Sequence, residues 1–144
     1  PRVIAIANRT KEKVKPVVSR FPPLDYDNLH PNTQVVDIET YLNERDSQGF
    51  RTLINATSAK EELDFKWCES LPIEGVTNFY DLSYSKLGET TPFLKWAKSQ
   101  DIGATRKIAR DGFGMLIHQA ALSFEVWTGI KPDTKITKAE LFDE

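Results

Sequence analysis

Apolar, β-branched runs alternate along the chain with segments of helical periodicity. The runs predict short strands at residues 2–7, 33–38, 51–56, 77–84 and 105–110. The helical patterns cover residues 11–21, 39–47, 91–100 and 111–129. The first run, RVIAIA, is almost continuously apolar, as in a strand that is covered on both faces. This alternation predicts an α/β fold with a doubly wound, mostly parallel sheet.

Several residues predict where the helices begin and end. Thr91 followed by Pro92 is a strong start signal, and Thr10 is a candidate cap for the first helix. Pro16 lies past the first turn of that helix and is expected to kink or shorten it. The closing helix is predicted to run from an Asp111 cap to Gly129.

Composition narrows the class of protein. The 144 residues are 40% apolar, enough to bury a core, so we expect one domain over residues 1–144. The net charge of −2 gives no footprint of a nucleic-acid partner, and no run is long enough to span a membrane. Cys68 is the only cysteine, which fits a reducing compartment, and we expect a cytoplasmic protein. His30 and His118 lie too far apart in the sequence to suggest a metal site.

Basic residues gather at the start of the chain, where Glu12 is the only acid among the first twenty residues. The segment NRTKEK follows the first predicted strand, at the strand end where doubly wound sheets bind ligands. Asn8, Arg9, Thr10 and Lys13 there supply donors and positive charge of the kind that a nucleotide 2′-phosphate needs. A solvated turn with a helix cap is the alternative interpretation.

The next two strand ends carry weaker signals. Asn55 at the end of the strand RTLINA, with Thr57 and Ser58 after it, offers hydrogen bonds to a cofactor, although Thr and Ser in loops usually only close turns. Asp81 near the end of the strand TNFYDL and Tyr84 just after it lie near the expected cleft. The tyrosine ring can equally cap the core while its hydroxyl stays in water.

The closing helix, DGFGMLIHQAALSFEVWTG, is apolar around most of its circumference. Gly112, Met115 and Gln119 share one face at helical spacing. A glycine there allows close approach to the backbone, and a buried unpaired amide costs roughly 1 to 3 kcal/mol, so we expect this face to meet a polar ligand. A core glutamine satisfied by a backbone group is the alternative, and His118 is expected to point elsewhere, without a catalytic role.

Taken together, the segments ANRTKEK, INATS, FYDLSYSK with TPFLKWA, and DGFGMLIHQAA resemble the cofactor-binding half of shikimate dehydrogenases. The resemblance covers essentially the whole chain and implies a Rossmann-like sheet. It implies that Asn8, Arg9, Thr10 and Lys13 bind the 2′-phosphate of NADP. It also implies that Asn55, Thr57, Ser58, the main chain of Leu82, Gly112 and Met115 line the rest of the cofactor site. Tyr84 and Gln119 are then expected to contact the substrate.

The sequence also departs from this family. No G-x-G-x-x-G loop precedes RVIAIA, so we expect a domain truncated at its N-terminus, without the first strand, glycine loop and first helix. The loop NATSAKEEL has Lys60 near where many relatives have glycine. The catalytic lysine and aspartate of the family lie in an N-terminal domain, and no residue here matches them.

The resemblance implies NADP-dependent, reversible reduction of 3-dehydroshikimate to shikimate in aromatic amino-acid biosynthesis, in a protein that includes the missing domain. This chain alone is expected to be inactive and prone to self-association through exposed strand edges. Two alternatives stay open. One is a quinate/shikimate dehydrogenase of broader specificity, and the other is a non-catalytic interaction domain with the same fold.

Overall fold

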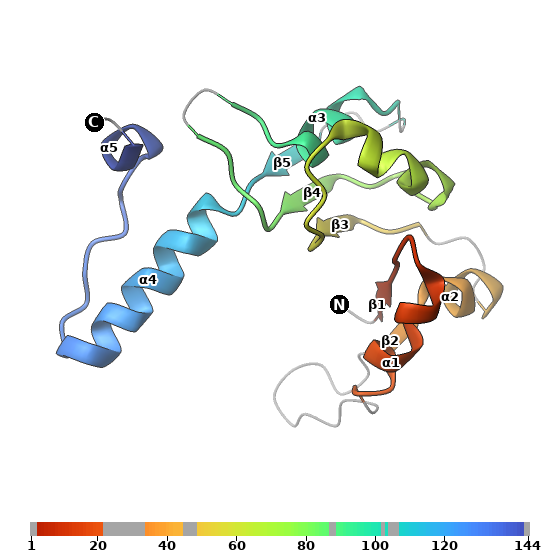
Figure 1. Ribbon diagram of the computed structural model, residues 1–144, viewed down its shortest axis with the longest axis horizontal. Coiled ribbons are helices and arrows are strands. Elements are labelled where there is room, and N and C mark those ends of the chain that lie inside the picture. Colours follow the sequence, from red (N-terminus) through yellow and green to blue (C-terminus); the bar gives the residue numbers. More distant parts are fainter. Residues whose placement is uncertain are drawn as a thin grey trace. The chain divides into compact units, whose positions relative to one another are not determined.

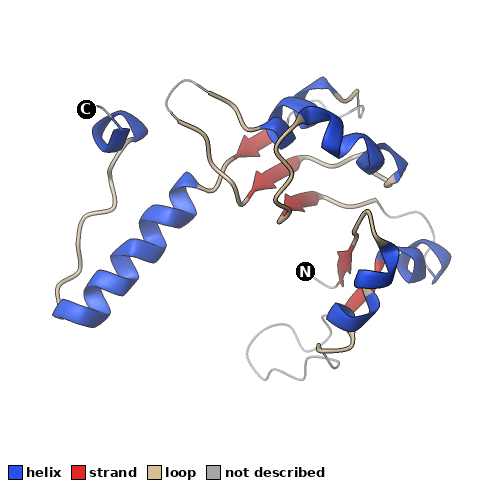
Figure 2. Cartoon of the chain, in the orientation of Figure 1, coloured by secondary structure: helices blue, strands red, loops and turns tan. Residues whose placement is uncertain are grey.

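A computed structural model describes residues 3–21, 34–44, 49–86, 89–101, 103 and 107–142. The chain divides into two compact units, residues 1–48 and 49–144, which are considered separately below (Figure 1). Helices and strands alternate along the chain in both units, and every strand pair in the described residues is parallel (Figure 2). The predicted α/β class with a parallel sheet is therefore confirmed, while a single domain over 1–144 stays a prediction.

In its described residues, the first unit contains a parallel pair of strands and three short helices. Its elements are β1 (Val3–Ile6), the 3-10 helix η1 (Lys11–Lys13), α1 (Lys15–Val18), β2 (Gln34–Asp37) and α2 (Ile38–Glu44). Val3 pairs with Gln34 and Ile6 with Asp37. The predicted helix over 11–21 is divided at Val14, and Pro16 occupies the first turn of α1, where its missing N–H costs nothing. Thr10 stands at the N-cap of η1, but its side chain makes no capping bond.

The second unit contains a three-stranded parallel sheet of order β3-β4-β5. Its elements are β3 (Thr52–Asn55), the 3-10 helix η2 (Glu62–Ser70), β4 (Asn78–Asp81), α3 (Pro92–Ser99), β5 (Ile108–Arg110), α4 (Phe113–Thr128) and α5 (Lys138–Phe142). As predicted, Thr91 caps α3, since its hydroxyl accepts a hydrogen bond from the Leu94 N–H, and Gly129 ends α4 in a left-handed conformation. Neither η2 nor α5 was predicted from the apolar pattern.

Aromatic rings form the core of the second unit. Phe79 from β4 packs with Phe65 from η2 and with Phe93 and Trp96 from α3. The ring centroids of Phe65 and Phe93 lie 5.3 Å apart in an edge-to-face arrangement. This packing fixes α3 and η2 against β4, and it leaves the carboxyl ends of the strands free to carry polar loops.

Cys68 lies within this core at 5% exposure, and burial raises the pKa of its thiol to about 12. Because the thiolate is the reactive form, we expect the folded chain to react negligibly with an aromatic disulfide reagent at pH 8. The same chain in denaturant should react stoichiometrically within minutes. A native reaction as fast as the denatured one would show that this core opens readily.

The closing helix differs from its predicted environment. None of the α4 residues is buried, and large apolar side chains such as Leu122, Val126 and Trp127 are strongly exposed. The apolar circumference of this helix therefore indicates a surface without a partner in the described part of the chain. Within that same part, no helix is both long and apolar enough to cross a membrane.

Candidate functional site

The carboxyl ends of β3 and β4 bring polar side chains together. Asn55 and Asp81, the last residues of the two strands, are register partners and are 6% and 1% exposed. The Asn55 Nδ2 donates a 2.9 Å hydrogen bond to the Asp81 Oδ1. The Asn55 Oδ1 accepts hydrogen bonds from the backbone N–H and the hydroxyl of Thr57, at 3.0 and 2.8 Å. Two loops are thereby fixed at the edge where parallel sheets bind ligands.

Gly112 lies just after β5, at this same edge of the sheet. Its N–H donates to the carbonyl of Ser83 over 2.9 Å. A Cβ atom at this position would lie 2.1 Å from the Leu82 carbonyl oxygen. Since the φ of Gly112 is −75°, close approach rather than backbone conformation requires glycine. The sequence-based expectation of close approach is correct, but the approaching group is the protein's own main chain.

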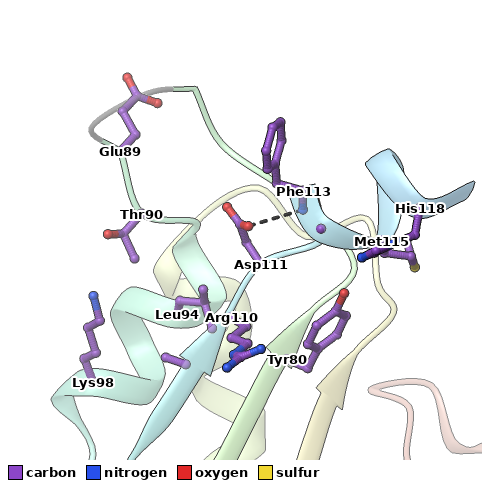
Figure 3. Close-up of a pocket in the computed structure, with 12 residues that line it drawn as sticks. Tyr80, Glu89, Thr90, Leu94, Lys98, Arg110, Asp111, Phe113, Met115 and His118 are labelled. Carbon is purple, nitrogen blue, oxygen red and sulfur yellow. Dashed lines mark hydrogen bonds between the residues drawn. The ribbon is translucent and has the colours of Figure 1, made fainter. Parts of the chain in front are cut away.

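A cavity of about 650 Å³ opens beside the start of α4 (Figure 3). Basic side chains from three elements line it, namely Lys98 of α3, Arg110 of β5 and His118 of α4. Met115 lies beside His118 in Figure 3, and the Tyr80 side chain points toward them. The expectation that His118 points away from the face of Met115 is therefore wrong, because residues three apart on a helix are neighbours.

The C-terminal helix is fastened to the same region. The Lys138 Nζ forms an ion pair with Asp111 and donates a 3.0 Å hydrogen bond to the Ser85 carbonyl. It also lies 5.6 Å from the centroid of the Phe113 ring. Asp111 in turn accepts a 3.2 Å hydrogen bond from the Phe113 N–H at the start of α4. Lys138 thus connects α5, α4 and the loop after β4.

The loop after β1 lies in the first unit and exposes Asn8, Arg9, Thr10 and Lys13. The Asn8 Oδ1 accepts a 2.9 Å hydrogen bond from the Thr10 N–H, which shapes the turn. A cavity of about 330 Å³ adjoins Asn8 and the start of α2. Lys11 at its rim pairs with Glu39, and this hydrogen bond raises the pKa of Lys11.

Asp37 also lines this smaller cavity. Hydrogen bonds from the hydroxyl and the N–H of Thr40 lower the pKa of its carboxyl group. Asp37 therefore stays charged well below neutral pH and holds the start of α2.

Of the twelve side chains or main-chain groups expected in a site, the structure brings Asn55, Thr57, Leu82 and Gly112 together. The four expected phosphate-binding residues lie together in the other unit. Ser58, Tyr84, Met115 and Gln119 are exposed. For Gln119 this corrects the argument from a buried amide, because the helix is not covered in the described structure. A substrate contact of Gln119 stays a prediction.

A parallel sheet with polar loops at the carboxyl ends of its strands places this chain in the class of Rossmann-like α/β folds. Within that class, residues 112–142 match the model of the shikimate 5'-dehydrogenase C-terminal domain. The resemblance expected from the sequence motifs, to shikimate dehydrogenase, is therefore confirmed.

Individual relatives extend this similarity over the whole chain. This chain is 36% identical to an NADP(+) shikimate dehydrogenase of Psychromonas ingrahamii, over 98% of the chain and 46% of that protein. It is 35% identical to the Nitrosomonas eutropha enzyme over 100% of the chain and 46% of that protein. The chain thus spans about half the length of the curated relatives it matches.

Two solved structures resemble this chain in fold over nearly its whole length. A shikimate dehydrogenase crystallised in complex with NADP+ superposes with a TM-score of 0.55 at 26% identity, over 96% of this chain and 45% of that one. An Ael1 enzyme from Pseudomonas putida gives a TM-score of 0.54 at 28% identity, over 92% of this chain and 42% of that one.

Proposed function

We propose that this chain supplies the NADP-binding part of a shikimate dehydrogenase, which reversibly reduces 3-dehydroshikimate to shikimate. The observation that carries the proposal is the exposed loop after β1, where Asn8, Arg9, Thr10 and Lys13 combine amide, hydroxyl and cationic donors. The residue directly after β1 is Ala7 and the next is Asn8, so no carboxylate stands where an NAD-binding sheet holds its ribose hydroxyls. This donor set fits a phosphate on the 2′ position of the ribose.

The second unit fits the nicotinamide end of the same cofactor. Asn55 and Thr57 fix one loop, and the Leu82 main chain lies against Gly112 with Met115 one turn further along α4. NADPH supplies the hydride when bound, and these residues are proposed to orient its nicotinamide ring. Tyr84 and Gln119 are proposed to contact the substrate from the loop after β4 and from α4.

Catalysis is proposed to require the part of the relatives that this chain does not span. No residue here matches the family's catalytic lysine and aspartate, so the 144-residue chain alone should give no shikimate-dependent reduction of NADP+. We also propose that the enzyme works in the cytoplasm on small molecules of the shikimate pathway, and that the isolated chain self-associates.

Binding of the phosphorylated half-cofactor tests the proposal directly. Adenosine 2′,5′-bisphosphate, titrated into the chain and followed by backbone NMR, should shift the amides of residues 8–13. Adenosine 5′-diphosphate, which places both phosphates at the 5′ position, should shift them less at equal concentration. Equal shifts from the two nucleotides would contradict a 2′-phosphate site.

A further inference from the structure

Asp81 is almost completely buried, yet none of the cofactor contacts proposed above uses its carboxyl group. It is 1% exposed at the end of β4, beside the aromatic core. A buried carboxyl group destabilises a fold unless hydrogen bonds satisfy it. The hydrogen-bond partners of the Asp81 carboxyl group therefore indicate its role at the end of β4.

The Asp81 Oδ1 accepts two hydrogen bonds, one from the end of β3 and one from the loop after β4. One comes from the side-chain amide of Asn55 at 2.9 Å, and the other from the backbone N–H of Ser83 at 3.0 Å. The other end of the Asn55 amide accepts both bonds from Thr57. The two side chains thus hold the backbone after β3 and after β4, together with the 2.9 Å hydrogen bond from the Leu82 N–H to the Asn55 carbonyl.

The loop after β4 contacts the start of α4 through Leu82 and Ser83. The Ser83 carbonyl accepts the 2.9 Å bond from the Gly112 N–H, and the Leu82 carbonyl fills the space where a side chain at 112 would lie. A movement of residues 82–83 would therefore move the surface that Leu82 and Gly112 form together.

We propose that Asn55 and Asp81 are a positioning pair, which sets the backbone of residues 82–83 against Gly112 and so shapes the nicotinamide side of the cofactor site. The inference rests on the proposed function for the identity of the ligand. The positioning itself rests only on the hydrogen bonds within the chain. The Asn55 amide and the Asp81 carboxyl group bond to each other, and the proposal does not require either group to contact the cofactor.

Exchanging the two residues tests the pair. Asn55→Asp alone places two carboxyl groups within hydrogen-bond distance and removes the side-chain amide that donates to Asp81. The double variant Asn55→Asp with Asp81→Asn again pairs one amide with one carboxylate, with the donor of the 55–81 bond now at position 81. Because both bonds to Asp81 meet at its Oδ1 atom, the new amide must turn so that its nitrogen donates to the carboxylate at 55 while its oxygen accepts from the Ser83 N–H. The carboxylate at 55 can still accept both bonds from Thr57.

Amide hydrogen exchange measures the positioning without any ligand. In Asn55→Asp, we expect exchange of the Gly112 and Ser83 amides to accelerate about tenfold or more, the scale of one lost hydrogen bond. The exchange variant should return both to within about threefold of the original chain. The Lys95 N–H, which bonds to the Thr91 carbonyl within α3, is the control for global destabilisation.

Equal acceleration of amide hydrogen exchange at Lys95 and Gly112 would overturn the proposal. Failure of the double variant to restore protection of these amides would also overturn it. If Asn55→Asp does not fold, recovery of a folded spectrum in the exchange variant is itself the expected rescue. In that case Asn55→Ala, which removes the amide without adding charge, takes the place of Asn55→Asp in the hydrogen-exchange measurement.

A second measurement separates this inference from the proposed function. NADP+ added to the original chain should shift the amides of Leu82 and Gly112, and these shifts should be lost in the single variant and recovered in the exchange variant. If the original chain shows no NADP+ shifts, the proposed function fails at this site, while the hydrogen-exchange result still decides whether the pair positions the loop.

Discussion

Gly112→Ala should lower the free energy of unfolding of the chain by about 2 kcal/mol or more, at the upper part of the range for an overpacked site. The added methyl group would lie 2.1 Å from the Leu82 carbonyl oxygen and 2.7 Å from its carbon, so the backbone on one side must move. Because the hindrance comes from main-chain atoms, no rotamer change relieves it. Urea unfolding monitored by tryptophan fluorescence measures the loss.

Gly114→Ala is the matched control, two residues further along. A Cβ atom at Gly114 meets nothing within 4 Å, and this position already lies within α4. Replacing a helical glycine with alanine stabilises by roughly 0.5 to 1 kcal/mol. The two substitutions should thus have opposite signs, and similar losses at both positions would show that contact with Leu82 is not the cause.

Arg9→Ala should weaken binding of NADP+ by about ten- to a hundredfold while leaving the weaker binding of NAD+ nearly unchanged. The substitution removes a guanidinium group that the proposal places on the 2′-phosphate, which NAD+ lacks. Isothermal titration with both nucleotides, on the chain or on a complete enzyme that contains it, gives the two ratios.

Two further variants sharpen the Arg9 experiment. Arg9→Lys keeps the charge but loses the planar pair of donors, so it should fall between the original residue and alanine. Arg20→Ala removes one positive charge from the same unit outside the proposed loop and should affect both nucleotides equally. Equal losses of NADP+ and NAD+ binding in Arg9→Ala would exclude a specific contact with the 2′-phosphate.

Local sequence signals predicted the helices and strands whose ends depend on neighbouring residues. Thr91 and Pro92 start α3, Pro16 lies in the first turn of α1, and Gly129 ends α4. Each of these acts through its own backbone or through a hydrogen bond three residues away, so no tertiary information is needed.

Other features depend on groups far apart in the sequence. The Asn55–Asp81 bond joins residues 26 positions apart, and it can be foreseen only when the register of β3 and β4 is known. η2 was missed because its residues do not follow an apolar helical period, although Glu61 and Asp64 carry a reciprocal capping signal. Gln119 was expected on a face that meets a polar ligand, because the rest of its helix is apolar. Periodicity shows that a helix is apolar but does not show what covers it.

The parallel ladder of the second unit has a consequence for how the site comes into being during synthesis. Each strand pairs with a partner from a distant part of the chain, so β3 gains its ladder only after β4 has been made, and β4 gains its second ladder only after β5. Closing such long loops is slow compared with forming a helical turn. Gly112 follows the last of these strands, so the surface that it forms with Leu82 is assembled only after β5 has left the ribosome.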